Sequence, residues 1–191
     1  MYAILLAAGL STRMGCQKLL LPIGNSTMVE KVLDNLRGSG FSRVCAVFSQ
    51  ETDLAVSASG EWLIRGINTA PERGQSSSLQ IGLEMVPTGE DFCIMLGDLP
   101  FAQAADIRAL REKFAEMPQD KTCMTPCRDG VFGHPMFYRS IWKKRLSSAL
   151  GDSGGKKILL EYNEEILRVE TPDGHFRDID TPREYEASIE K

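Results

Sequence analysis

AILLAAGLSTRMGCQK, residues 3–18, carries the strongest signal in this sequence. The apolar run at residues 3–6 predicts a buried β-strand, and Gly9 and Gly15 predict a flexible loop after it. That loop holds two fixed cations, Arg13 and Lys18. Backbone N–H groups and positive charge in such a loop bind phosphate, so we expect a polyphosphate site there.

The spacing of the glycines excludes the two common phosphate loops. A P-loop has four residues between its glycines and a lysine directly after the second. Here five residues separate Gly9 from Gly15, and Lys18 lies three residues further on. A G-x-G-x-x-G pattern is also missing from the loop, which excludes the dinucleotide-binding interpretation. The alternative is a plain strand-to-helix turn with solvated basic side chains, but that turn does not require these residues at these spacings.

Composition indicates an ordinary globular enzyme or binding domain. The chain has 191 residues, of which 42% are apolar and 25% charged, and we expect residues 1–191 to form one domain with a full core. The net charge of −4, from 22 basic and 26 acidic residues, argues against general nucleic-acid binding. The apolar run near the N-terminus is too short to span a bilayer and lacks the features of a signal peptide. We therefore expect a cytoplasmic protein with no membrane partner.

The five cysteines point to a reducing compartment, because their odd number and spacing do not form a disulfide framework. Cys123 and Cys127 lack a second ligand pair, which makes a zinc site a poor interpretation, and buried free thiols are expected instead. Cys16 is unusual because it lies inside the proposed phosphate loop.

Strand and helix patterns alternate along the chain. Strands are predicted at residues 3–6, 44–48, 63–67, 92–96, 122–126, 136–138 and 166–170. Helices are predicted at residues 28–37, 52–57, 76–86, 106–114, 141–150 and 156–162, and a last helix starts at Thr181 with Glu184 completing a capping box. Repeated β-α alternation predicts a mostly parallel central sheet with helices on both sides.

Carboxylates follow the expected strands at the edge where ligands bind in such sheets. Asp98, in Gly97-Asp98-Leu99-Pro100, directly follows the apolar strand at residues 92–96. Asp180 and, more weakly, Asp178 are further candidates. Magnesium prefers a few carboxylates together with phosphate and water oxygens, so Asp98 and Asp180 are predicted ligands. The alternatives are a turn-forming aspartate at 98 and an aspartate that favours the positive end of the last helix at 180.

Two polar segments remain. Ser76, Ser77 and Ser78 sit at a predicted helix start, where one serine would suffice as a cap, so we expect the cluster to contact a base or phosphate. Asn68 is a lesser candidate for the same pocket. His134, in Gly133-His134-Pro135, is either a structural histidine, the commoner role of a lone histidine, or a substrate contact, and His175 is assigned no role.

The pattern Leu6-Ala7-Ala8-Gly9-x-Ser11-x-Arg13-Met14-Gly15-x-x-Lys18 resembles the opening of the nucleotidyltransferases of the molybdenum cofactor group. These enzymes are related to the sugar-nucleotide pyrophosphorylases. Gly97-Asp98-Leu99-Pro100 resembles the group's Gly-Asp-Met-Pro, and Asp178-Ile179-Asp180-Thr181-Pro182 resembles its closing motif. Five such motifs occur in the right order between Tyr2 and Tyr185. The resemblance implies a single-domain, Rossmann-like, three-layer α/β/α nucleotidyltransferase fold.

The resemblance also implies roles for individual residues. Arg13, Lys18 and Asp98 are expected to be catalytic, and Asp98 and Asp180 to hold Mg²⁺. The nucleotide is expected to contact Leu6, Ala7, Ala8, Gly9, Arg13, Lys18, Asn68, Ser76, Ser77 and Ser78, and the acceptor to contact His134 and Lys156. The segment that contains Lys156 departs from the group's Gly-Asp-x-Gly-Ala-Arg by Gly155 for alanine and Lys156 for arginine, and lysine lacks the bidentate geometry of arginine.

Ala8, the triple serine and the Gly-His-Pro segment resemble the cytidylyltransferase branch. This branch implies CMP transfer from CTP to the terminal phosphate of molybdopterin, release of pyrophosphate, and transient contact with a recipient molybdoenzyme. The alternatives are another phosphorylated acceptor, such as a sugar phosphate, with GTP or ATP as donor, and a non-catalytic carrier of molybdopterin or nucleotide. A carrier does not need two metal carboxylates, so the pair Asp98 and Asp180 favours an enzyme.

Overall fold

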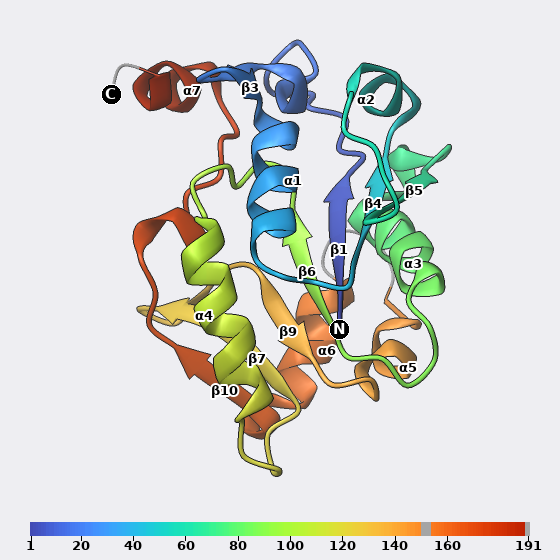
Figure 1. The fold of residues 1–191 in the computed structure, drawn as a ribbon, viewed down its shortest axis with the longest axis vertical. Helices are drawn as coiled ribbons and strands as arrows, with labels where there is room; N and C mark the ends of the chain where they lie inside the picture. The colour runs from blue at the N-terminus through green and yellow to red at the C-terminus, as the bar shows by residue number, and fades with distance from the viewer. Residues whose placement is uncertain (150–153, 190–191) are drawn as a thin grey trace.

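A mostly parallel β-sheet forms the middle layer of the fold (Figure 1). The computed structural model describes residues 1–149 and 154–189. The strands of the sheet are β1 (Tyr2–Ala7), β4 (Arg43–Phe48), β5 (Leu63–Ile67), β6 (Phe92–Leu96), β7 (Cys123–Arg128), β9 (Met136–Tyr138) and β10 (Ile166–Val169). Their order is β10-β7-β9-β6-β1-β4-β5, and the short strand β8 (Val131–Phe132) pairs with β7. The prediction of a mostly parallel sheet is confirmed.

Strand β1 lies at the centre of the sheet because it is apolar on both faces. It pairs in parallel with β4 on one side and with β6 on the other. Ala3, Leu5 and Ala7 pack into the core on one face, while Ile4 and Leu6 pack into the core on the other. A strand buried on both faces has a continuous apolar sequence in place of the alternating pattern of a half-exposed strand.

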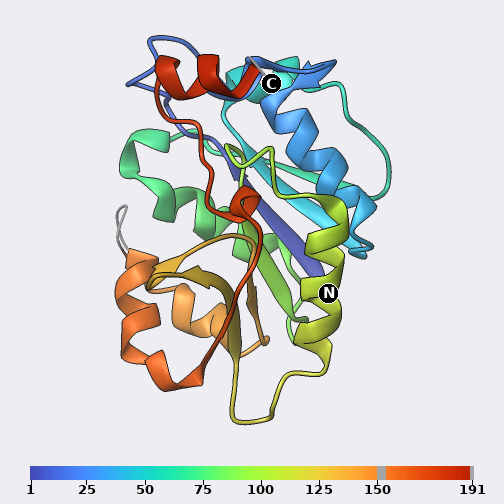
Figure 2. The same ribbon diagram turned by 90° about the vertical axis from the view of Figure 1, so that its left-hand side faces the viewer.

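Helices cover both faces of this sheet (Figure 2). On one face lie α1 (Met28–Gly38) and α4 (Ala104–Ala115), and on the other α3 (Gln75–Met85), α5 (Trp142–Leu146) and α6 (Gly154–Glu161). The short α2 (Gln50–Ala55) follows β4, and α7 (Pro182–Ile189) closes the described chain beside the hairpin of β2 (Pro22–Ile23) and β3 (Ser26–Thr27). Single 3₁₀ turns occur at Lys18–Leu20, Pro71–Arg73, Asn163–Glu165 and Asp173–His175. The three-layer α/β/α expectation is confirmed.

Local capping chemistry sets several helix starts. At α7 the backbone N–H of Thr181 donates to Glu184 Oε2 at 2.8 Å, and the N–H of Glu184 donates to Thr181 Oγ1 at 3.3 Å, as the capping box predicts. At α2 the hydroxyl of Ser49 accepts from the N–H of Thr52 at 3.2 Å. Because Ser49 is the cap, α2 spans Gln50–Ala55, two residues earlier than the predicted range of 52–57.

The C-terminal half departs from simple β-α alternation. Strand β9 runs antiparallel between β6 and β7, and β7 then resumes the parallel direction with β10. The helix predicted at residues 141–150 is described as the shorter α5, and position 150 lies outside the described residues. Cys45, Cys93 and Cys123 are buried free thiols, as expected, whereas Cys127 is a free thiol that is only half-buried, and Cys16 is exposed.

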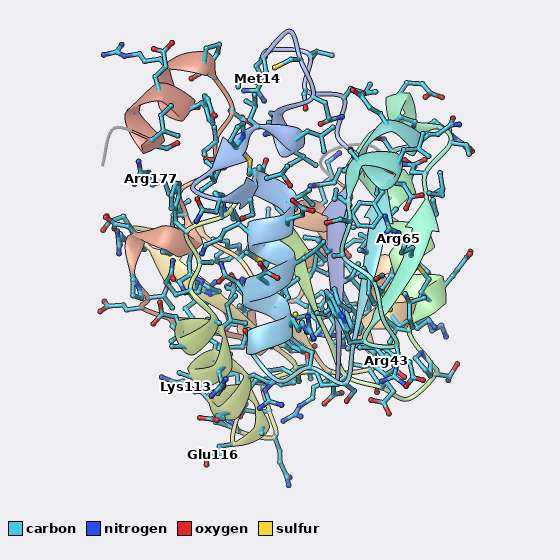
Figure 3. All side chains as sticks on the ribbon, turned by 45° about the horizontal axis from the view of Figure 1, so that its top comes forward. Met14, Arg43, Arg65, Lys113, Glu116 and Arg177 are labelled. Atoms are coloured by element: carbon cyan, nitrogen blue, oxygen red, sulfur yellow. The ribbon has the colours of Figure 1, made fainter. Side chains whose placement is uncertain are left out.

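The loop after β1 and the end of α4 lie toward opposite ends of the sheet. Figure 3 places Met14, on the loop after β1, at one end of the molecule, and Lys113 and Glu116, at the end of α4, toward the other. The carboxyl ends of the parallel strands therefore share the end that carries the glycine-containing loop. Among the described helices, none combines the length and the apolar character needed to cross a bilayer.

Helix α3 approaches β1 closely because residue 82 is glycine. A Cβ at Gly82 would collide with Ile4 Cγ2 and lie 3.5 Å from Val47 Cγ2. We expect Gly82→Ala to lower the free energy of unfolding by about 1–3 kcal/mol through overpacking, although alanine is the better helix former. Urea denaturation measures this difference.

Gly155→Ala is the matched control in α6, because a Cβ there meets no atom of the described residues within 4 Å. We expect it to leave stability unchanged or to raise it by up to about 1 kcal/mol. Equal effects of the two substitutions would contradict the close packing of α3 on β1.

Candidate active site

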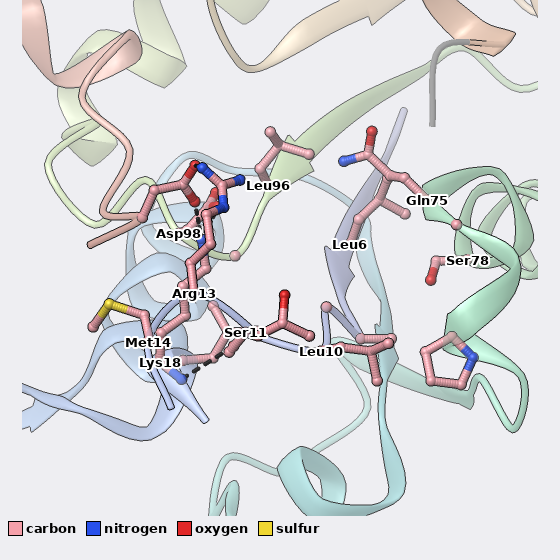
Figure 4. A pocket seen from close by; sticks show the side chains of 18 of the residues that line it. Leu6, Leu10, Ser11, Arg13, Met14, Lys18, Gln75, Ser78, Leu96 and Asp98 are labelled. Atoms are coloured by element: carbon pink, nitrogen blue, oxygen red, sulfur yellow. Dashed lines mark hydrogen bonds and ion pairs between the residues drawn. The ribbon is translucent and has the colours of Figure 1, made fainter. Parts of the chain in front are cut away.

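The carboxyl ends of β1 and β6 open into a cavity of about 510 Å³ (Figure 4). We call this the first cavity. Its wall includes the loop after β1, the turn after β6, the start of α3 and the segment before α7. The side chains that line it include Leu6, Ala8, Gly9, Ser11, Arg13, Lys18, Gln75, Ser78, Leu96, Asp98 and Asp180. Figure 4 shows Arg13 and Asp98 on one side of this cavity and Gln75 and Ser78 on the other.

Gly97 brings Asp98 against the end of β1. Its N–H donates to the carbonyl of Leu6 at 2.9 Å, and a Cβ at this position would lie only 3.2 Å from that oxygen. The carbonyl of Asp98 in turn accepts from the N–H of Ile179 at 3.3 Å. Ile179 is 1% exposed and anchors its segment in the core. The turn after β6 is therefore tied both to β1 and to the segment that carries Asp180.

Lys18 lies between the two carboxylates that the sequence selects. Its Nζ is 2.7 Å from Asp98 Oδ2 and 2.6 Å from Asp180 Oδ1. Arg13 Nη1 lies 2.9 Å from the other oxygen of Asp180, while most of the arginine side chain stays exposed. The structure thus brings Arg13, Lys18, Asp98 and Asp180 together in one cluster, which we call the charged cluster.

The contacts in the charged cluster shift proton affinities. Burial by itself lowers the pKa of Lys18, but the charges and hydrogen bonds of Asp98 and Asp180 outweigh it and raise the pKa. The hydrogen bond from Lys18 lowers the pKa of Asp180, and Arg13 adds to this effect. Partial burial of the carboxyl, followed by the negative charges of Asp98 and Asp180, raises the pKa of Asp178. At neutral pH Lys18 is a cation and Asp180 an anion.

Ser11 and Gln17 hold the loop in shape. Ser11 adopts a left-handed φ of 52°, its hydroxyl donates to Gln17 Oε1 at 2.8 Å, and it accepts from the N–H of Lys18 at 3.1 Å. The amide of Gln17 donates to the carbonyl of Gly9 at 3.2 Å. Neither residue was selected from the sequence, because their roles depend on contacts inside the loop. Ser11 does belong to the recognised motif, which is the signal that would have found it.

The carboxylates of the charged cluster provide only some of the ligands that a divalent metal needs. Asp98 Oδ1 is buried and accepts no hydrogen bond from the described part of the chain, so it has an oxygen to offer. Asp180 contacts the Nζ atom of Lys18, the same atom that contacts Asp98. Across residues 1–149 and 154–189, however, no group of three or more His, Cys, Asp or Glu side chains could hold a metal. A metal on Asp98 and Asp180 would therefore need phosphate and water oxygens to complete its ligand set.

The serine segment is divided between two places. Ser78 lines the first cavity, whereas Ser76 lines a neighbouring one. Ser77 donates to the carbonyl of Gly74 at 2.7 Å and accepts from Asn68 Nδ2 at 2.8 Å. Asn68 is 3% exposed and also donates to Ser78 Oγ at 2.9 Å. Asn68 and Ser77 therefore shape the start of α3 and do not line the first cavity.

The side chain of Ala7 does not line the first cavity. It is fully buried in the core on the face of the sheet that α1 and α4 cover. Leu6, Ala8 and Gly9 do line this cavity. Ala8 is buried, with 3% of its surface exposed, and it contributes to the lining of this cavity. The contacts that these residues make with a nucleotide stay a prediction.

A second cavity, of about 630 Å³, adjoins the first. Leu6, Gln75 and Leu96 line both. His134 lines the second cavity, and its contact with the acceptor stays a prediction. Lys156 lies in α6, and its side chain is outside the described part of the structure. The remaining wall of the second cavity comes from α3, β6, β8, β9, α5, α6 and β10.

Residues 3–166 match the sequence model of the MobA-like NTP transferase domain. The chain belongs to this family. The prediction of a nucleotidyltransferase is thereby confirmed at the level of the family, and the cytidylyltransferase branch stays a prediction.

Comparisons with individual proteins agree with this class. The chain is 29% identical over 118 residues to the bifunctional protein GlmU of Sinorhizobium medicae, a match that covers 59% of the chain and 26% of the relative. It is 25% identical over 171 residues to GlmU of Fervidobacterium nodosum, covering 87% of the chain and 36% of that protein. The chain thus spans about a quarter to a third of the length of these curated relatives.

Solved structures share the fold along their whole length. Rv0371c of Mycobacterium tuberculosis superposes with a TM-score of 0.81 at 25% identity, covering 100% of the chain and 98% of the neighbour. A nucleotidyl transferase from Methanothermobacter, Mth528, has a TM-score of 0.80 at 21% identity, with coverages of 99% and 95%. A further structure of Rv0371c is a complex with manganese, with a TM-score of 0.77, 23% identity and coverages of 100% and 98%. The predicted fold class is confirmed.

Removal of the Lys18 cation should destabilise the protein in a pH-dependent way. Asp180 has a lowered pKa, so its contribution is present above the ordinary value of 3.8 and is lost as the pH falls through the lowered value. Lys18 has a raised pKa, so its contribution is present below 10.5 and is lost only at higher pH. At pH 7 we expect Lys18→Met to cost about 1–3 kcal/mol, because it leaves the half-buried Asp98 without a cation and Asp180 with only the mostly exposed Arg13.

Urea denaturation of Lys18→Met and of wild type, at pH 7 and at pH 3, measures this cost. We expect the difference in the free energy of unfolding between the two proteins to be smaller at pH 3. Asp173→Asn is the control, because it removes an exposed ion pair to Arg128 and should change the midpoint little. A loss of stability in Lys18→Met that is independent of pH would contradict the electrostatic explanation.

Proposed function

We propose that residues 1–191 form one nucleotidyltransferase domain that transfers CMP from CTP to the terminal phosphate of molybdopterin and releases pyrophosphate. The observation that supports this most directly is the charged cluster, in which Lys18 lies between Asp98 and Asp180 at the mouth of a glycine-containing loop. Two adjoining cavities provide separate places for the two substrates.

The triphosphate lies in the first cavity. The loop from Gly9 to Lys18 offers backbone N–H groups and two cations to phosphate oxygens. Arg13 is mostly exposed, so its guanidinium is free to move from Asp180 to a phosphate. Lys18 keeps its proton at neutral pH, since its pKa is raised, and it stabilises the negative charge that builds on the leaving pyrophosphate.

The reaction is an in-line displacement at the α-phosphorus of CTP. An oxygen of the acceptor phosphate forms the new bond to phosphorus, the bond from the α-phosphorus to the bridging oxygen breaks, and its electron pair leaves with pyrophosphate. Such a reaction requires no protein nucleophile, so the chain's contribution is positioning and charge stabilisation. Gly97 and Ile179 support this by fixing the backbone on either side of Asp98.

A divalent metal, Mg²⁺ by our proposal, would be held by Asp98 and Asp180 and would neutralise charge on the reacting phosphates when bound. The buried oxygen Asp98 Oδ1 lacks a hydrogen-bond donor in the described part of the chain, which supports this assignment. The structural neighbour Rv0371c, at 23% identity, is a complex with manganese. Because Lys18 contacts both carboxylates, it is close enough to share them with a metal.

Ala8 supports cytidine as the base. Its methyl lies in the floor of the first cavity, where the Leu-Ala-Gly-Gly pattern of the guanylyltransferases has only hydrogen. One methyl group narrows the base pocket and disfavours the larger purines. Transfer to another phosphorylated acceptor is the second candidate, since the curated relatives that match are GlmU proteins. The recipient molybdoenzyme stays a prediction.

Pyrophosphate release tests the function directly. With Mg²⁺ and molybdenum cofactor present, and CTP, GTP, ATP and UTP compared side by side, we expect release with CTP and little with GTP or ATP, because Ala8 narrows the base pocket against purines. Release with GTP or ATP would keep the reaction and reject the base assignment. The absence of release with all four nucleotides would reject cofactor cytidylylation.

Asp98 should be essential for turnover. We expect Asp98→Asn to lower kcat by about a hundredfold or more, because the amide keeps the shape of the side chain but removes the charge. Steady-state kinetics with CTP and molybdenum cofactor measures this, and Asp34→Asn, an exposed position on α1, is the matched control. Near-normal turnover of Asp98→Asn would reject the metal assignment.

A further inference from the structure

The side chain of Lys18 reaches the charged cluster from a backbone that is held on both sides. The N–H of Lys18 donates to Ser11 Oγ at 3.1 Å, and its carbonyl accepts from the N–H of Leu21 at 3.1 Å. The side chain is only 11% exposed, yet it lines the first cavity. Lysine carries its charge on a flexible four-carbon stem. The ammonium group can therefore turn toward the first cavity while the backbone stays in place.

The ammonium group contacts the same oxygens that a metal bridging the two carboxylates would need. Nζ lies 2.7 Å from Asp98 Oδ2 and 2.6 Å from Asp180 Oδ1. Arg13 Nη1 contacts the second oxygen of Asp180 at 2.9 Å. Of the oxygens of these two carboxylates, only Asp98 Oδ1 has no partner in the described part of the chain. A divalent metal that bridges Asp98 and Asp180 must therefore displace Lys18, Arg13 or both.

The charges of the cluster disfavour a metal that arrives alone. The two cations, Lys18 and Arg13, balance the carboxylates of Asp98 and Asp180. A divalent cation at these carboxylates would be repelled by the ammonium group, and this repulsion is strong where water is partly excluded. Within residues 1–149 and 154–189 no third acidic, histidine or cysteine side chain completes a ligand set. We therefore expect the free metal to bind weakly.

A polyphosphate removes both obstacles. Its oxygens accept charge-assisted hydrogen bonds from Lys18 and Arg13, and these bonds replace the contacts of the two cations with the carboxylates. The same phosphate oxygens add to the metal ligands that Asp98 and Asp180 supply. All four side chains line the first cavity, so a polyphosphate there lies within reach of each of them.

We propose that Lys18 makes the site selective for a metal–polyphosphate complex over the free metal. When phosphate oxygens bind its ammonium group, Lys18 leaves its place between Asp98 and Asp180, and the metal of the complex takes that place. Lys18 and the metal thus use the two carboxylates in turn. The inference rests on the proposed function, from which it takes the metal site, and it adds a role in ligand selection to the charge stabilisation by Lys18.

Binding of free Mn²⁺ tests the first half of this exchange without any turnover. EPR spectroscopy measures the free ion in the absence of phosphate. We expect Lys18→Met to bind Mn²⁺ about tenfold more tightly than wild type, because removal of the ammonium group frees oxygens of Asp98 and Asp180. Lys113→Met is the matched control, since Lys113 is exposed on α4 toward the other end of the molecule (Figure 3), and it should bind Mn²⁺ as wild type does.

Binding of the preformed complex of Mn²⁺ with tripolyphosphate tests the second half. This ligand offers oxygens to Lys18, so we expect wild type to bind it about tenfold more tightly than Lys18→Met does. The order of the two proteins thus reverses between the free metal and the complex. Calorimetry measures this affinity, and association of metal with phosphate in solution does not enter the comparison because the complex is formed beforehand.

The reversal is what an exchange requires and what simpler roles of Lys18 do not produce. Unchanged or weaker binding of free Mn²⁺ to Lys18→Met would overturn the proposal, since Lys18 would then not compete with the metal. Tighter or equal binding of the complex to Lys18→Met would also overturn it, since Lys18 would then only block the site. The double variant Lys18→Met/Asp98→Asn should lose the gain in Mn²⁺ affinity. Retention of the gain would locate the ion elsewhere and overturn the proposal.

The wild-type protein gives a reading that does not depend on the folding of Lys18→Met. In ¹⁵N-lysine-labelled protein, the ammonium signal of Lys18 is assigned with Lys18→Arg, which keeps the positive charge. We expect Mg²⁺ alone to leave this signal in place and an equal concentration of the Mg²⁺–tripolyphosphate complex to shift it. A shift with Mg²⁺ alone, or no shift with the complex, would overturn the proposal.

These measurements use neither CTP nor molybdenum cofactor. A failure of cofactor cytidylylation in the pyrophosphate assay therefore leaves their outcome unaffected. Conversely, pyrophosphate release with CTP together with no reversal of affinities would keep the proposed function and reject the exchange.

Discussion

The ammonium group of Lys18 lies between the carboxylates of Asp98 and Asp180, and the geometry of the site depends on this contact. The three residues are 80 and 162 positions apart in the sequence. Two half-buried carboxylates repel each other, so their close approach requires a cation between them. The backbone bonds from Gly97 to Leu6 and from Ile179 to Asp98 hold the same three segments together. The ion pairs and the backbone hydrogen bonds therefore favour the same arrangement of these three segments.

Strand β1 connects this cluster with the rest of the fold. Its odd residues pack under α1 and α4, and its even residues pack under α3, α5 and α6. Leu6, at the carboxyl end, lines both cavities. The two cavities thus share one wall, which rests on the central strand β1. A rigid wall suits a reaction in which positioning supplies most of the catalysis.

The antiparallel strand β9 forms part of the wall of the second cavity. Its insertion between β6 and β7 carries Gly133 and His134 toward β6, where the carbonyl of Ile94 meets the imidazole. The same insertion lets the segment of His175 pack against His134. A purely parallel sheet, as in the N-terminal half, would not bring these segments together. The second cavity therefore lies where the chain departs from simple β-α alternation.

Features carried by neighbouring residues could be predicted from the sequence: the buried strand before Gly9, the glycine-containing loop with Arg13 and Lys18, and the capping box of Thr181 and Glu184. Their physical causes lie within a few residues of chain. The charged cluster could be predicted only as a set of candidates at one sheet edge. Tertiary structure decided that Lys18 contacts both aspartates and that the triple serine is split between two cavities. It also decided that the segment of His175 is hydrogen-bonded to His134. Each of these features depends on contacts between distant segments that no local pattern encodes.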